Sequence, residues 1–148
     1  MVEQSCPLTQ VFSEVLANMA FLFTAPRPEF PPPEDGWLEC TIGYRGPERG
    51  SLRLRCSDGF GRLLAANLLG LQPNSPEALG AVEDTVKELL NVLCGRMTTA
   101  IYGHQTAFDL EVPRLIRLAA VPPPRENTAD SVEFYVEGHS VQLVHERE

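Results

Sequence analysis

One segment of the chain combines residue types that could bind and orient a reacting group on a partner: a carboxylate and an amide one helical turn apart, with a glycine one turn further on. At about 100° per residue, the polar side of this segment falls within roughly 40° of one line. This line, called the polar ridge below, consists of Asp84, Glu88, Asn91, Gly95, Thr98 and Tyr102. The opposite side is apolar and predicts a buried stripe of Val82, Val86, Leu89, Leu93, Met97 and Ala100.

The polar ridge admits two interpretations, an ordinary solvated helix face and a functional surface. Solvated faces are common, but they favour strong helix formers such as Lys, Glu and Ala. Asn91 is a weak helix former, and a glycine at position 95 costs about 1 kcal/mol relative to alanine. Unfavourable local choices tend to gather at functional sites, which favours the second interpretation. Because Gly95 has no side chain, a bulky group could approach the amide of Asn91 there.

Three helices are predicted, and the polar ridge lies on the last. Apolar residues at helical spacing predict the first helix over Leu8–Phe23, ended by a proline-rich loop. The second runs from a Ser57-Asp58 cap to about Leu69, and the third runs from a Ser75 cap to about Tyr102. Proline follows the cap of the third helix, and a glycine follows the end of each of these two helices.

Strands precede and follow the helical pair. Alternating apolar residues predict a hairpin over 37–44 and 51–56 and a closing hairpin over 132–136 and 141–143. A further strand is predicted over 108–118, with Pro113 at an edge or bulge position. The order α, β, β, α, α, β, β, β indicates an α+β fold, with one antiparallel sheet and helices packed on one face.

The length and composition set limits on the function. A chain of 148 residues with 43% apolar residues predicts one domain covering residues 1–148. The net charge of −8 argues against nucleic acid or an anionic membrane as the main partner. The start of the chain lacks the basic residues of a signal peptide, and no apolar run is long enough to span a bilayer. We therefore expect a cytoplasmic protein.

No other residue pattern marks a cofactor, metal or nucleophile. The four cysteines contain no Cys-x-x-Cys pair, which argues against a zinc or redox site. Those at positions 40, 56 and 94 fall at inward or flanking positions and are expected to fill the core. The histidines are scattered, and no glycine-rich phosphate loop is present. We expect no cofactor or metal on this chain.

The segment from Asp84 to Gly95 resembles the signature of the CheC–CheX family of chemotaxis phosphatases: Asp or Ser, three residues, Glu, two residues, Asn, and a glycine four residues on. The resemblance continues into Thr99-Ala100 and into the segment 108–113, Phe-Asp-Leu-Glu-Val-Pro. The order of elements fits the family as well. The resemblance therefore covers nearly the whole chain.

The family has two forms. The CheC form carries the signature on two pseudo-symmetric helices, whereas the CheX form carries it once and is typically a homodimer. In the first helix, Glu14 and Asn18 stand four residues apart rather than three, and Gln10 occupies the place of the expected Asp or Ser. The resemblance thus implies a CheX-like chain with one site and a pseudo-symmetric fold. A homodimer through sheet edges is expected, because unpaired edges invite pairing with another chain.

The resemblance implies a phosphatase that accelerates hydrolysis of the aspartyl phosphate on a CheY-type response regulator receiver domain. It assigns catalysis to Glu88 and Asn91, and contact with the partner to Asp84 and Gly95. Asn91 would orient the attacking water, and Glu88 would pair with a lysine of the receiver. Mg²⁺ would be supplied by the receiver, and this chain would need no nucleophile of its own.

A non-catalytic domain of the same fold, which docks on a signalling partner without turnover, is the alternative. The intact pattern of Asp84, Glu88 and Asn91 favours the enzyme, because a pure docking domain has no need of an amide in register with the carboxylates.

Overall fold

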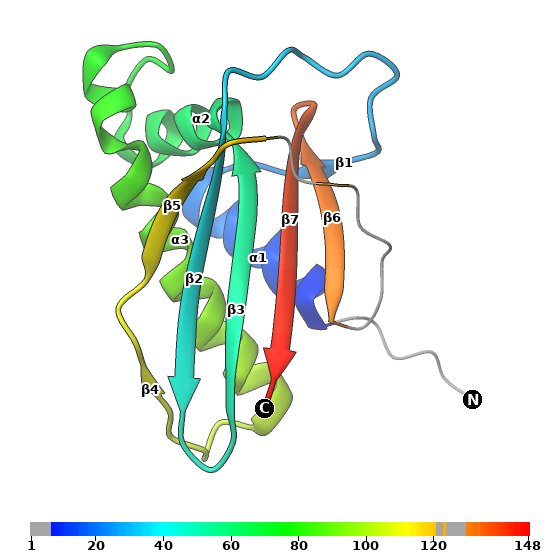
Figure 1. The fold of residues 1–148 in the computed structure, drawn as a ribbon, viewed down its shortest axis with the longest axis vertical. Helices are drawn as coiled ribbons and strands as arrows, with labels where there is room; N and C mark the ends of the chain where they lie inside the picture. The colour runs from blue at the N-terminus through cyan, green and yellow to red at the C-terminus, as the bar shows by residue number, and fades with distance from the viewer. Residues whose placement is uncertain (1–6, 121–122, 124–129) are drawn as a thin grey trace.

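Three helices pack on one face of a curled antiparallel sheet in the computed structural model, which describes residues 7–120, 123 and 130–148 (Figure 1). The helices are α1 (Pro7–Ala20), α2 (Asp58–Leu69) and α3 (Pro76–Tyr102). The strands are β1 (Thr24–Ala25), β2 (Trp37–Arg45), β3 (Arg49–Ser57), β4 (Asp109–Leu110), β5 (Arg114–Leu118), β6 (Ser131–Val136) and β7 (His139–Arg147). The strand order is β1-β6-β7-β3-β2-β4, and β5 also pairs with β2. The predicted fold class is confirmed.

The long strands β2, β3 and β7 form the centre of the sheet. β2 pairs with β3 from Trp37↔Ser57 to Arg45↔Arg49. β7 extends beyond the predicted hairpin to Arg147, because it pairs with β3 along almost its whole length. Alternation along these strands directs one set of side chains toward the helices, and all of this set are buried: Leu38, Cys40, Ile42, Tyr44, Leu52, Leu54 and Cys56.

Both α2 and α3 begin and end where the sequence predicts. The hydroxyl of Ser57 accepts a hydrogen bond from the backbone N–H of Phe60 at 3.1 Å, and the hydroxyl of Ser75 accepts one from Ala78 at 3.2 Å. Gly70 ends α2 in the left-handed conformation at φ 68°, which favours glycine. Ser75 at the start of α3 and Gly103 at its end set the length of this helix and hence the span of the polar ridge.

The first helix is shorter than predicted. α1 ends at Ala20, because Phe21 adopts a left-handed conformation with φ 55° and turns the chain. Its backbone N–H donates to the carbonyl of Ala17 at 3.2 Å. Leu22 is still buried, but Phe23 is 66% exposed instead of lying on the buried face of a helix. The two residues after it form the short strand β1 on β6, which the sequence did not predict.

The predicted strand over 108–118 is two strands. β4 and β5 both pair with β2, and residues 111–113 between them, including Pro113, are not part of either strand. Proline has no N–H to donate to a neighbouring strand, so the break falls where the sequence predicts an edge or bulge. The predicted loop over 122–130 lies largely outside the described residues.

The space between the helices and the sheet is filled by apolar side chains. Phe12 of α1 stacks on Phe134 of β6 with ring centroids 4.3 Å apart. Cys40, Cys56 and Cys94 are fully buried in this core, as predicted. Burial raises the pKa of Cys40 to about 11 and that of Cys94 to about 12, so these thiols stay protonated at neutral pH.

A buried cluster of polar side chains connects the end of α3 to the sheet through hydrogen bonds. The hydroxyl of Tyr44 lies 2.7 Å from Nε2 of His145 on β7 and 2.9 Å from the hydroxyl of Tyr102 at the end of α3. His145 is 3% exposed, and this burial lowers its pKa, an effect that Arg147 strengthens and Asp130 opposes. The imidazole is therefore neutral in the folded protein at neutral pH.

Stability is predicted to fall as the pH is lowered from 7 to 5. In the unfolded chain His145 takes up a proton near its ordinary pKa of 6.5, whereas the folded state resists protonation. The unfolded state then binds more protons, so acid favours unfolding. Urea unfolding at both pH values measures the difference in unfolding free energy.

His145→Gln should reduce the difference in unfolding free energy between pH 7 and pH 5, whatever its effect on stability at pH 7. His104→Gln, at an exposed position after α3, is the matched control and should leave the difference unchanged. Equal differences in the parent and in His145→Gln would contradict the prediction.

Candidate functional site

The orientation of α3 about its own axis determines which of its side chains are exposed to solvent. Asp84, Glu88 and Asn91 are exposed, as the spacing predicts. Five residues of the opposite stripe are buried, each 4% exposed or less: Val82, Val86, Leu89, Leu93 and Met97. An exposed carboxylate and amide therefore lie on the side of α3 away from the core.

The prediction fails near the end of α3. Thr98, predicted on the exposed ridge, is 4% exposed, whereas Ala100, predicted in the buried stripe, is exposed. The chain folds back after α3, and Phe108 packs on Tyr102 with ring centroids 5.0 Å apart, which covers this end of the ridge. On the other side, Ala100 borders a hollow against the first turns of α1. The usable ridge therefore ends before Thr98.

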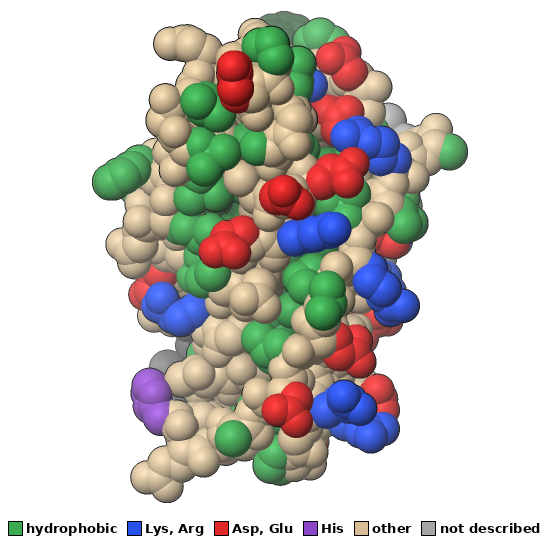
Figure 2. All heavy atoms as spheres, turned by 90° about the vertical axis from the view of Figure 1, so that its left-hand side faces the viewer, with side chains coloured by type: hydrophobic (Ala, Val, Ile, Leu, Met, Phe, Trp, Pro, Cys, Tyr) green, Lys and Arg blue, Asp and Glu red, His purple; other side chains and the backbone are tan. Residues whose placement is uncertain are grey.

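A second wall stands opposite the first half of the ridge. The residues that join β4 to β5 lie beside α3 and enclose an open hollow with it, called the α3 hollow below. It is lined by Asp84, Lys87, Glu88 and Asn91 of α3 and by Leu110, Glu111, Val112 and Pro113. Figure 2 views the side of the molecule formed by α3, β4 and β5, where charged and apolar side chains are interspersed.

The second wall is held by the edge of the sheet. β4 pairs Leu110 with Tyr44, and β5 pairs Arg114 with Thr41, both on β2. Between them, the backbone N–H of Glu111 donates to the carbonyl of Gly43 at 2.8 Å. The carboxylate of Glu111 lies beside Gly43, on the face of β2 opposite the buried side chains of Ile42 and Tyr44. A Cβ at position 43 would first meet this flexible end of the Glu111 side chain, which can move aside. The wall is therefore held by its backbone pairing with β2.

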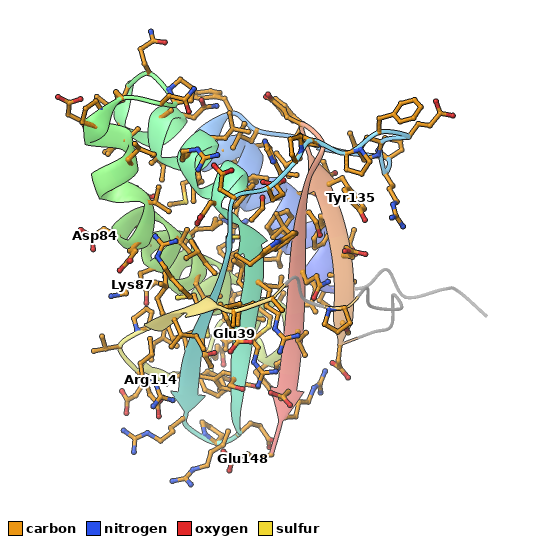
Figure 3. All side chains as sticks on the ribbon, turned by 45° about the horizontal axis from the view of Figure 1, so that its top comes forward. Glu39, Asp84, Lys87, Arg114, Tyr135 and Glu148 are labelled. Atoms are coloured by element: carbon orange, nitrogen blue, oxygen red, sulfur yellow. The ribbon has the colours of Figure 1, made fainter. Side chains whose placement is uncertain are left out.

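The charged residues that line the α3 hollow have no ionic partner among the described residues. They are the acidic residues Asp84, Glu88 and Glu111 and the basic residue Lys87. None of them forms an ion pair with another described residue. Figure 3 shows Asp84 and Lys87 extending from α3 on the same outer side. A shallow, charged and open surface of this kind suits a macromolecular partner better than a small molecule, which prefers an enclosed and largely apolar pocket.

The amide of Asn91 is available for a partner. The side chain is exposed, and it makes no hydrogen bond with the described part of the chain. A free amide offers an acceptor oxygen and two N–H donors on one planar group. It can accept a hydrogen bond from a water while it donates to an anionic oxygen.

Gly95 lies one turn beyond the hollow and does not line it. A Cβ placed on Gly95 would meet no atom of the chain within 4 Å, so the space beside it is open. The room that the sequence predicts at this position is therefore present.

The region of α1 that corresponds to a second signature is differently organised. Glu14 accepts a hydrogen bond from Gln10 at 3.3 Å and pairs with Arg96 of α3 at 3.4 Å. Asn18 is exposed on the same helix. The carboxylate of Glu14 is thus engaged within the chain, unlike that of Glu88.

The sequence pattern assigns no role to Lys87 or Glu111. Lys87 stands inside the signature, four residues before Asn91, and that helical spacing was a signal for it. Glu111 reaches the hollow only through the pairing of β4 and β5 with β2, which the local sequence does not specify.

Some other kinds of site are not found in the described part of the chain. Within residues 7–120, 123 and 130–148, no group of three or more His, Cys, Asp or Glu side chains is arranged to hold a metal ion. No helix of the described residues is long and apolar enough to cross a membrane.

The fold is shared with solved chemotaxis proteins. CheX from Vibrio vulnificus is 23% identical, with a TM-score of 0.69 and coverage of 96% of this chain and 94% of that one. CheX from Desulfovibrio desulfuricans is 16% identical, with a TM-score of 0.69 and coverage of 96% and 97%. CheX from Borrelia burgdorferi, in a complex with CheY, BeF3 and Mg²⁺, is 18% identical, with a TM-score of 0.68 and coverage of 96% of each chain.

A comparison with curated proteins gives no match. The model of one protein family, described as chemotaxis phosphatase CheX, matches residues 38–136, which is more than half of the chain and includes all of α3. The chain therefore belongs to the CheX family of chemotaxis phosphatases.

Proposed function

We propose that this chain accelerates hydrolysis of the aspartyl phosphate on a CheY-type receiver domain. The observation that carries the proposal is the exposed, unbonded amide of Asn91, one turn from the unpaired carboxylate of Glu88, in an open hollow. The chain would act in the cytoplasm, where its partner signals, and the receiver would contribute Mg²⁺. No cofactor is proposed on this chain.

Asn91 orients the attacking water in this proposal. Its amide oxygen accepts a hydrogen bond from the water, and its NH₂ donates to a phosphoryl oxygen. Glutamine residues orient water in the same way in other phosphoryl-transfer enzymes. Because the acyl phosphate stays on the receiver, catalysis is a matter of positioning, and no covalent intermediate forms on this chain.

Glu88 and Asp84 align the two proteins. The carboxylate of Glu88 pairs with the active-site lysine of the receiver, which fixes the position of Asn91 against the phosphoryl group. Asp84, one turn further along α3, contacts the receiver at the edge of the hollow. The complex of CheX with CheY from Borrelia burgdorferi supports the choice of a CheY-type partner.

Asn91→Ala should lower kcat by about 100-fold or more, the scale of losing one orienting donor. Water positioning acts mainly in the transition state, so affinity for a receiver carrying beryllofluoride, a stable phosphoryl mimic, should change little. Phosphate release and calorimetric titration measure the two quantities. Asn18→Ala, which removes an exposed helical amide from α1, is the matched control and should retain the parent rate.

Glu88→Ala should weaken affinity for the same mimic as well as lower turnover, because the receiver's lysine loses its partner. Glu77→Ala removes an exposed carboxylate from the first turn of α3 and should do neither. If Asn91→Ala is folded and hydrolyses as fast as the parent, Asn91 does not orient the water. If the parent itself does not accelerate hydrolysis, the chain is instead a domain that docks without turnover.

Gly95 and Gly80 provide a matched pair for testing contact with the partner. Both lie within α3, and a Cβ on either would meet no atom of the chain within 4 Å. Each Gly→Ala change should therefore raise the unfolding free energy by about 0.5–1 kcal/mol. Only Gly95→Ala should also weaken binding to the receiver, because its methyl group would occupy space that the partner needs. Equal binding by the two variants would remove Gly95 from the interface.

The chain should form a homodimer through the edges of its sheet. Among the described residues, β5 pairs only with β2, and β6 pairs with β1 over only two residues. Backbone groups at these edges are open to pairing with a second copy. Light scattering coupled to size exclusion should report twice the monomer mass, and a monomer at high micromolar concentration would contradict the prediction.

A further inference from the structure

Lys87 is the sole lysine of the chain. Of the 12 basic residues, the other 11 are arginines, so arginine is used wherever else a positive charge stands. Lysine differs from arginine in presenting a compact point charge with three donors on a flexible stem. Its single occurrence falls inside the signature, between Asp84 and Glu88.

The position of Lys87 directs it to the same surface as Asn91. Residues four apart lie on neighbouring turns of one helix face, about 5–6 Å apart at their Cβ atoms. Lys87 is half-buried and lines the α3 hollow with Asn91. Its charge is also close enough to Cys40 on β2 to offset part of the rise in that thiol's pKa. The side chain of Lys87 thus borders the hollow on the outer side of α3 (Figure 3).

Lys87 has no ionic partner among the described residues, whereas neighbouring arginines have one. Arg96 pairs with Glu14 at 3.4 Å, and Arg117 pairs with Asp58 at 3.0 Å and with Glu83 at 3.7 Å. These arginines link elements of the fold to one another. Lys87 makes no such link, so its charge is available to a bound partner.

Lys87 is the only basic residue among the described residues that line the α3 hollow, and three acidic residues line it as well. A partner that offers a lysine to Glu88 and only positive charge around it would be repelled by Lys87. A partner that offers a lysine beside an anionic oxygen would pair favourably with both residues, its lysine with Glu88 and its anionic oxygen with Lys87. The hollow therefore presents a pattern of opposite charges rather than a uniform acidic surface.

We propose that Lys87 contacts an anionic oxygen at the phosphorylated site of the receiver, either of the phosphoryl group or of a carboxylate beside it. Lys87 thereby determines which receivers are accepted and in which register. The inference rests on the proposed function, since it assigns a further contact within the same site. Lys87 is a contact residue, and orienting the water remains the role of Asn91.

The sole lysine allows a direct test of contact. Reductive methylation with ¹³C-formaldehyde labels Lys87 and the chain's terminal amine, and it keeps the charge of the lysine. A sample of Lys87→Arg identifies the signal of the terminal amine. Unlabelled receiver with Mg²⁺ and beryllofluoride should shift the dimethyl-lysine signal in NMR spectra. An unshifted signal at a receiver concentration that saturates binding would overturn the proposal.

Kinetics test the consequence of the contact. Lys87→Ala should raise KM about 5-fold and change kcat less than about 2-fold, as expected for a contact made in the ground state. Lys87→Arg keeps the positive charge, so its KM should stay close to that of the parent. Lys87→Glu reverses the charge and should raise KM by about 30-fold or more. Arg27→Ala, which removes an exposed charge at the opposite side of the sheet, is the matched control and should leave KM unchanged. The parent's KM should also depend more steeply on salt than that of Lys87→Ala.

Affinities for receiver with and without beryllofluoride distinguish the two sources of the anionic oxygen. Loss of affinity for the beryllofluoride form alone indicates the phosphoryl group, and equal loss for both forms indicates a carboxylate. If the parent hydrolyses the receiver and Lys87→Ala matches Arg27→Ala in KM, the inference about Lys87 is wrong while the proposed function stands. If the parent has no activity on any receiver, the proposed function itself fails.

Discussion

The packing of α3 on the sheet is the interaction on which the candidate site depends. Its apolar stripe lies against β2 and the other helices, and Val86, Leu89, Leu93 and Met97 are completely buried. Burying one such side chain contributes roughly 1.5–3 kcal/mol. Rotation of the helix by one residue would expose part of the stripe, so the buried side holds the exposed side in place. Asn91 is thus positioned by residues that are themselves buried in the core.

The second wall of the α3 hollow depends on the edge of the sheet instead. Two short strands hold the residues between Leu110 and Arg114 against β2, and between them the backbone N–H of Glu111 donates to the carbonyl of Gly43. Short strands contribute few backbone hydrogen bonds, so this wall is less firmly held than the helix. The site therefore combines a rigid side that carries the amide and carboxylate with a weakly held side that completes the surface.

Local patterns predict much of this arrangement. Helix periodicity and the caps at Ser57 and Ser75 predict α2 and α3 because those signals reside in a few neighbouring residues. The end of α1 was missed, since the left-handed conformation of Phe21 has no local signal such as glycine. The exposure of the ridge was predicted as far as Asn91, but Thr98 is buried and Tyr102 packs on Phe108, which belongs to the chain that folds back after α3. Periodicity predicts which side of a helix faces the core, but tertiary contacts determine whether a residue on the other side stays exposed.

The open shape of the hollow fits a site that is completed by its partner. Enzymes that enclose a small substrate exclude water with their own walls, whereas a surface that offers only an amide and charges needs a second protein to exclude solvent. Ridge residues of this kind are exposed, so their identity affects folding by less than about 0.5 kcal/mol in most cases. The buried stripe holds α3 in the fold even though its polar ridge includes two weak helix formers, Asn91 and Gly95. One helix therefore contributes both to the core and to the candidate site.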